Sequence, residues 1–70
     1  MTAKSDRRLR LTRVMARAES VLGSTDKAGQ WLRKPNRALR GAAPVDLLDT
    51  DRGAQEVLAV LGRIEHGVYS

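Results

Sequence analysis

The sequence has 70 residues, enough for one domain, and a chain of this length buries only about 60% of the surface that its unfolded form exposes. We therefore expect marginal stability in isolation and a binding partner. The absence of cysteine excludes disulfide bonds and thiolate metal sites, and no apolar run approaches the roughly 20 residues of a membrane-spanning helix.

The net charge of +5 is concentrated at the start of the chain. Six basic side chains precede residue 18, opposed by Asp6 alone, so the remaining residues balance to zero. The basic start lacks the apolar segment of a signal peptide, so we expect a cytoplasmic protein. We expect no membrane partner either: association through the first helix is the weakest option, because the apolar face of that helix has no Trp or Phe. Uneven basicity of this kind indicates either a solvated helix surface or contact with an acidic partner such as nucleic acid.

The first predicted helix runs from about residue 7 to 22. Apolar side chains recur on one face at helical spacing: Leu11, Val14, Met15, Ala18, Val21 and Leu22. Arg10, Arg13 and Arg17 line another face. With Arg7, they are the candidates for weak phosphate contact with nucleic acid, and the alternative is that they are simply solvated.

A short second helix is expected next. Gly23 closes the first helix, and Ser24 can cap the second, because a serine side chain accepts hydrogen bonds from the free backbone N–H groups of a helix start. The second helix should end near Arg33 or Lys34, since Pro35 disfavours helical geometry in the residue before it.

Turns and single helical turns should follow. Asn36 can start a short turn, and Gly41 permits a backbone conformation that other residues resist. Pro44 fits the first position of another helical turn, up to Leu48. The acidic run at residues 49–51 then supplies a cap and negative charge for the next helix.

The last predicted helix covers residues 51–65. Its apolar side chains recur at steps of three and four: Ala54, Val57, Leu58, Leu61 and Ile64. Leu58 is expected at the middle of the buried face. Gly62 costs about 1 kcal/mol relative to alanine inside a helix, so we expect close packing within the fold or the close approach of a partner. Gly67 is expected to close the helix, which leaves Val68 and Tyr69 beyond it.

The elements together predict an all-α fold with two longer helices and short helical turns between them. The side chains expected to build its core are Trp31, Leu32, Leu39, Leu47, Val57, Leu58 and Leu61. The residues expected to set the turns are Pro35, Asn36, Gly41, Pro44 and Gly53.

The sequence offers little for catalysis. His66 is the single histidine, and there is no glycine-rich phosphate loop or cluster of metal ligands. Asp46, Asp49 and Asp51 are better explained as caps and helix-dipole partners than as catalytic carboxylates. We therefore expect no enzymatic activity, no metal and no cofactor.

Several segments resemble one known family. They are Ala28–Leu32, Pro35–Gly41, Pro44–Leu48, Thr50–Ala54 and Leu61–Tyr69. In order and spacing, residues 14–70 resemble the toxin-binding C-terminal domain of the Xre/MbcA/ParS-like antitoxins. The resemblance implies an all-helical domain of a type II toxin–antitoxin system that neutralises a RES-type toxin. Such toxins hydrolyse NAD or use it for ADP-ribosyl transfer, and the antitoxin covers their active-site cleft.

The sequence departs from the family pattern in two respects. Family members usually carry an Xre-like helix-turn-helix domain for operator binding and dimerisation, whereas only the basic segment 1–13 precedes residue 14 here. The chain is thus either a fragment or a natural short form, and the sequence leaves both open. The family also tends to have glycine where this chain has Arg40, so the turn before Gly41 should be less permissive.

The resemblance places the C-terminal end of the antitoxin close to the entrance of the toxin's cleft. The residues that we expect to contact the toxin are Arg63, Glu65, His66, Gly67, Val68, Tyr69 and Ser70. The competing hypothesis is a small nucleic-acid-binding protein that acts through its first helix. The toxin's chemistry, the stoichiometry, any higher-order complex and operator binding stay open at this point.

Overall fold

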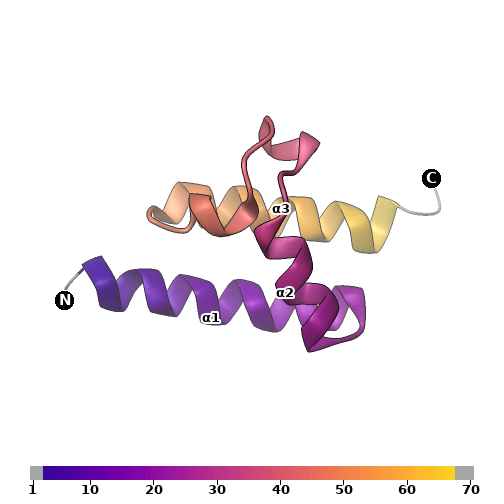
Figure 1. Cartoon of the computed structure of the whole chain (residues 1–70), viewed down its shortest axis with the longest axis horizontal. Helices are drawn as coiled ribbons and strands as arrows, with labels where there is room; N and C mark the ends of the chain where they lie inside the picture. Colours follow the sequence, from indigo (N-terminus) through magenta and orange to yellow (C-terminus); the bar gives the residue numbers. More distant parts are fainter. Residues whose placement is uncertain (1–2, 68–70) are drawn as a thin grey trace.

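The computed structural model describes residues 3–67, with side chains from residue 6, and this range forms helices and turns without a strand (Figure 1). The α-helices are α1 (Ala3–Leu22), α2 (Thr25–Arg33) and α3 (Asp51–Gly67). Two 3₁₀ helices, η1 (Arg37–Leu39) and η2 (Pro44–Leu47), lie between α2 and α3. The predicted all-α fold is confirmed, and both long helices extend a little beyond the predicted bounds.

The two long helices α1 and α3 lie side by side and run in the same direction, from left to right in Figure 1. This parallel arrangement is possible because α2, η1 and η2 carry the chain from the end of α1 back to the start of α3. Helix α2 packs against α1, whereas η1 and η2 pack against α3. Helix α3 therefore has covered surface on two sides.

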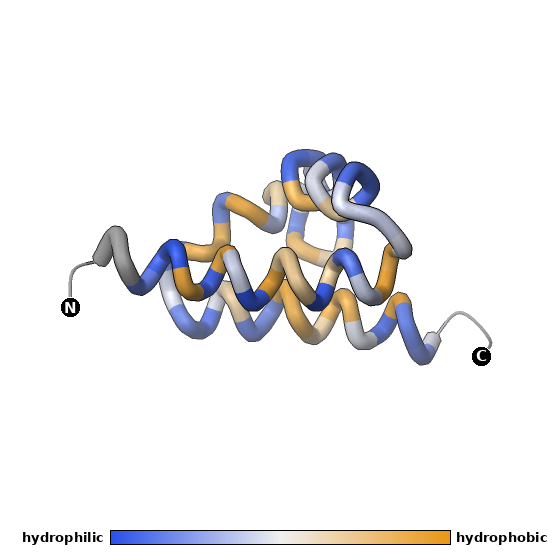
Figure 2. Tube along the Cα trace, turned by 90° about the horizontal axis from the view of Figure 1, so that it is seen from below, coloured by the Kyte–Doolittle hydropathy of each residue, from blue (hydrophilic) through white to orange (hydrophobic). Residues whose placement is uncertain are grey.

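Apolar side chains from all three α-helices and from η1 meet in one core together with Leu48, and η2 packs on it with Pro44 buried. The buried apolar side chains are Val14, Ala18, Ala28, Leu32, Leu39, Leu48, Ala54, Val57, Val60 and Leu61. In Figure 2 the apolar stretches of the long helices alternate with polar ones, as expected for helices with one buried face. Each fully buried valine or leucine contributes about 1.5 to 3 kcal/mol.

The structure corrects part of the predicted core. Leu32, Leu39, Val57 and Leu61 are buried as predicted, whereas three others are only partly buried: Trp31, Leu47 and Leu58. Val60, which the predicted stripe omitted, is 5% exposed. Because α3 packs against α1 and also against η1 and η2, its buried face is wider than one stripe and includes Val60.

The predicted boundaries of α2 are confirmed. Gly23 has a φ of +95°, and its N–H donates to the Glu19 carbonyl, which closes α1. The Ser24 hydroxyl accepts a hydrogen bond from Lys27 N at 3.1 Å. At the other end, Lys34 has an extended backbone, as the following proline requires.

The turn after α2 contains two successive residues in the left-handed region. Asn36 Oδ1 accepts a hydrogen bond from Ala38 N at 2.9 Å and so caps η1, as predicted. Gly41 has a φ of +85°, and Arg40 has a φ of +60°. A side chain in this conformation costs roughly 1 to 2 kcal/mol, which explains why glycine suits the Arg40 position. The Arg40 guanidinium pairs with Glu56 on α3 at 2.9 Å.

The start of α3 lies unusually close to η2. The Thr50 hydroxyl accepts a hydrogen bond from Gly53 N at 3.0 Å, which confirms a cap in the acidic run. A Cβ atom at Gly53 would lie 1.9 Å from the Leu47 carbonyl oxygen. Gly53 is thus required by backbone contact inside α3, beyond the turn role predicted for it.

The two later glycines of α3 differ from expectation. A Cβ atom at Gly62 would meet no heavy atom within 4 Å among the described residues, so close packing within the fold does not explain Gly62. The approach of a partner remains as the alternative. Gly67 belongs to α3, so the helix continues past its predicted end at residue 65.

Candidate functional site

The exposed end of α3 carries four of the seven predicted contact residues. Arg63, His66 and Gly67 are exposed, and the backbone that presents them is the last part of a 17-residue helix. A continuous helix fixes the relative positions of these groups. Val68, Tyr69 and Ser70 lie outside the described residues.

Glu65, the fourth of these residues, is engaged within the chain. Its Oε1 atom accepts a hydrogen bond from Arg17 Nη2 on α1 and lies 3.2 Å from His66 Nε2. The carboxylate therefore joins the ends of the two parallel helices and sits beside the histidine. Its position favours a supporting role for Glu65 at the end of α3.

An open groove of about 760 Å³ lies beside this end of α3, between the helix and η1. Val60, Ile64 and Ala38 supply apolar side chains to it, and Arg37 and Arg63 supply cations. Asn36 and Gly67 complete the lining. Sequence reasoning did not assign the η1 residues to the site, although the Pro35–Gly41 segment was among those that carried the family resemblance.

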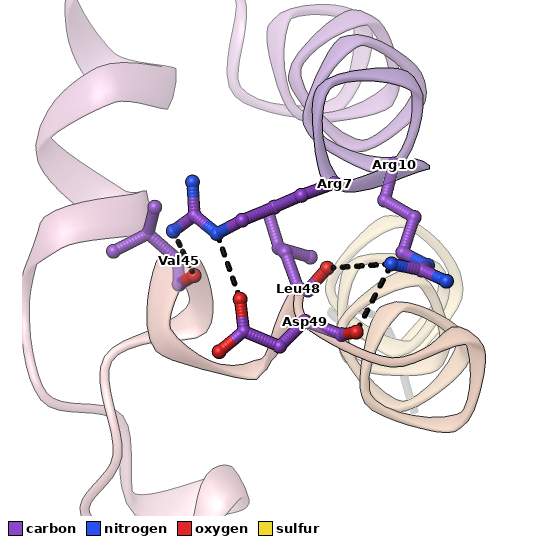
Figure 3. Close-up of polar contacts among 5 residues, drawn as sticks. All are labelled: Arg7, Arg10, Val45, Leu48 and Asp49. Atoms are coloured by element: carbon purple, nitrogen blue, oxygen red, sulfur yellow. Dashed lines mark hydrogen bonds and ion pairs between the residues drawn. The ribbon is translucent and has the colours of Figure 1, made fainter. Parts of the chain in front are cut away.

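Arg7 and Arg10 on α1 are hydrogen-bonded to η2 and to the segment that connects η2 with α3 (Figure 3). Arg7 Nε donates to Asp49 Oδ1 at 2.9 Å, and Arg7 Nη2 donates to the Val45 carbonyl at 3.3 Å. Arg10 Nη1 donates to the Leu48 and Asp49 carbonyls at 3.3 and 3.0 Å. These two arginines thus bind backbone carbonyls of their own chain.

The four candidate nucleic-acid contacts are not equivalent. Arg7, Arg10 and Arg17 each pair with a carboxylate of the chain, and the Arg10 side chain is only 16% exposed. The alternative of a solvated arginine face fits Arg10 least well, since the Arg7 and Arg17 side chains stay 43% and 40% exposed beside their carboxylates. Arg13 is exposed and lines a shallow pocket next to Asp51. Weak nucleic-acid binding stays a prediction, with Arg13 as the least engaged of its four residues.

Two further features are absent from the described residues. Residues 3–67 hold no group of three or more histidine, cysteine or acidic side chains arranged to bind a metal ion. None of the helices in that range is both long enough and apolar enough to cross a membrane.

Comparison with known families decides the assignment. Residues 17–67 match the family described as the antitoxin Xre/MbcA/ParS C-terminal toxin-binding domain. The chain belongs to this family. The match covers all of α2, η1, η2 and α3 and begins inside α1, so the exposed end of α3 and the groove beside it both belong to the family domain.

Relatives of this antitoxin-family domain carry consistent names. The chain is 44% identical over 68 residues to an antitoxin Xre from Photorhabdus laumondii and 41% identical over 68 residues to one from Yersinia enterocolitica. Each alignment covers 96% of this chain and 46% of the relative. The chain is also 35% identical to a protein named Prs ADP-ribosylating antitoxin from Sphingobium, and that alignment covers 99% of this chain and 49% of the relative. The chain thus spans about half the length of the curated relatives it matches.

Proposed function

We propose that this domain binds and neutralises a RES-type toxin that hydrolyses NAD or uses it for ADP-ribosyl transfer. The observation that carries the proposal is the match of residues 17–67 to a toxin-binding antitoxin domain. The name of the Sphingobium relative supports a link to ADP-ribosylation chemistry. On this view the antitoxin neutralises the toxin by covering its active-site cleft and catalyses no reaction itself.

The end of α3 is the element best suited to cover the cleft. Its exposed Arg63 and His66 lie on a helix whose other face is fixed in the core through Val57 and Leu61. The pairing of Arg17 with Glu65 further restrains this end against α1. A restrained helix end loses little conformational freedom on binding, which favours affinity. Arg63 and residues 65–70 together are the proposed contact segment, with Glu65 as its support.

The geometry supports the alternative of nucleic-acid binding less well. Phosphate binding by Arg7, Arg10 or Arg17 would have to replace ion pairs and carbonyl bonds that these side chains already make. We propose that the isolated domain binds DNA only weakly and without sequence preference, with an affinity that falls as salt rises. Specific operator binding would then require an Xre-like domain outside this sequence.

The proposal can be tested with purified components. The chain is co-expressed with the cognate RES-type toxin, with a tag on the toxin alone, and the complex is isolated by affinity and size-exclusion chromatography. NAD consumption by the toxin is then measured while the separately purified chain is titrated in. We expect co-purification and complete inhibition at a fixed stoichiometry. A folded chain that neither co-purifies nor inhibits would exclude the proposed function.

A further inference from the structure

We infer that the groove between η1 and α3 receives a segment of the toxin in which an apolar side chain is flanked by carboxylates. This inference rests on the proposed function and adds a second wall to the contact site, formed by η1. It also assigns a partner chemistry to residues that the predicted contact segment did not include, principally Arg37 and Ala38.

The floor of the groove is apolar and already shaped. Val60 is held in the core, while Ile64 is partly buried and packs against it. Across from them, Ala38 on η1 has a side chain too short to fill the space. The Asn36 cap fixes Ala38 in place through its backbone N–H. An apolar side chain from a partner would therefore bury surface here without a rearrangement of the backbone.

The rim of the groove carries cations that lack partners within the described residues. Arg7, Arg10, Arg17 and Arg40 each pair with a carboxylate of the chain. Neither Arg37 nor Arg63, which face the groove from opposite walls, has such a pair among residues 6–67. Two guanidinium groups beside an apolar floor favour an occupant that brings carboxylates, since complementary charge fixes both partner and register.

Charge also argues against a second copy of this chain as the occupant. A symmetric contact through the groove would bring the arginine rims of both copies together, on a molecule with a net charge of +5. The two glutamates of α3, Glu56 and Glu65, are already paired, with Arg40 and Arg17. A toxin segment is not subject to either restriction.

The first test compares charge reversals at the groove and away from it. Toxin binding is measured by titration calorimetry for the wild-type chain and for Arg37→Glu, with Arg8→Glu as a matched control on the exposed face of α1. We expect Arg37→Glu to weaken binding by about tenfold or more and Arg8→Glu to change it by less than about twofold. The loss should shrink as the salt concentration rises, because the lost interaction is between charges. Circular dichroism confirms that each variant is folded.

The second test probes the floor without a change in charge. Ala38→Gln adds a side chain to the open space and should weaken binding in the same assay. A photo-reactive benzophenone amino acid at position 38 should crosslink to the toxin, and mass spectrometry should locate the crosslink in a segment with both apolar and acidic residues. The same group at position 8 should give no crosslink.

The outcomes separate the two proposals. If the wild-type chain binds toxin while Arg37→Glu and Ala38→Gln bind equally well, the groove inference is wrong and the proposed function stands. A crosslink from position 38 to a second copy of the chain, or to residues 68–70 of the same chain, would overturn the inference as well. Failure of the folded wild-type chain to bind the toxin would remove the proposed function and, with it, this inference.

Discussion

The Arg10 guanidinium on α1 donates from Nε to Oδ1 of Asp51 on α3, at 2.8 Å across a separation of 41 residues. Arg10 also donates hydrogen bonds to the Leu48 and Asp49 carbonyls. Arg7 donates to the Asp49 carboxylate and to the Val45 carbonyl (Figure 3). The basic segment 1–13, which the sequence analysis placed ahead of a domain at 14–70 as the start of the first helix, therefore contributes contacts to that domain. Its arginines fix the segment that leads into α3.

The first prediction concerns this contact. Arg10→Met keeps much of the apolar stem and removes the donors, so it should lower the free energy of unfolding by about 1 to 3 kcal/mol. Arg13→Met is the matched control, since Arg13 is exposed on the same helix, and it should change stability by less than about 0.5 kcal/mol. Urea denaturation followed by circular dichroism measures both. Equal stabilities would show that the Arg10 contacts contribute nothing to the fold.

Gly53→Ala should destabilise the domain strongly. The new Cβ atom would overlap the Leu47 carbonyl oxygen, so either η2 or the first turn of α3 must shift. Forced overlap of this kind costs about 1 to 3 kcal/mol or more. Thermal unfolding provides the measurement, and an unchanged melting temperature would mean that the two segments are not in contact in solution.

Gly62→Ala should have the opposite effect on the same helix. Because the added methyl group meets no neighbour, the higher helix propensity of alanine should raise the stability by up to about 1 kcal/mol. If a partner approaches Gly62 closely, the same variant should bind the toxin less tightly despite its greater stability. A loss of stability in the isolated chain would contradict the open surroundings of Gly62.

Two leucines of α3 provide a further comparison. Leu61 is fully buried, whereas Leu58 is only partly buried. Leu61→Ala should therefore cost about 2 to 5 kcal/mol, and Leu58→Ala should cost clearly less. The order of the two denaturation midpoints shows which of the two substitutions destabilises the domain more. A greater loss for Leu58→Ala would restore the buried stripe that the sequence suggested and contradict the packing described above.

Local features of the fold were predictable where the residue's own chemistry decides the structure. Ser24 and Asn36 are caps because their side chains accept bonds from nearby backbone N–H groups, and Lys34 leaves the helix because Pro35 follows. Gly41 was also predictable, because glycine tolerates the positive φ that this turn requires. None of these inferences needs knowledge of a distant part of the chain.

Features that depend on distant residues were missed or misassigned. The helical period places Arg10 and Arg17 away from the apolar face of α1, but it does not show that α3 supplies carboxylates there. Likewise, the burial of Val60 depends on how α1, η1 and η2 pack around α3, which no spacing within α3 reveals. Of the candidate site, the end of α3 was predictable from the family resemblance. The groove beside it was not predictable, because it depends on where η1 lies relative to α3.

The most direct test of the proposed neutralisation compares the intact chain with one that lacks residues 67–70. The core side chains from Ala54 to Leu61 are untouched by this truncation, so circular dichroism should show the same helical fold. NAD consumption by the cognate RES-type toxin is measured while either chain is titrated in. We predict that the truncated chain needs a clearly higher concentration for half-inhibition, and that Tyr69→Ala weakens binding by about 1 to 3 kcal/mol, as is usual for an aromatic anchor. Equal inhibition by the folded, truncated chain would contradict neutralisation by the C-terminal end.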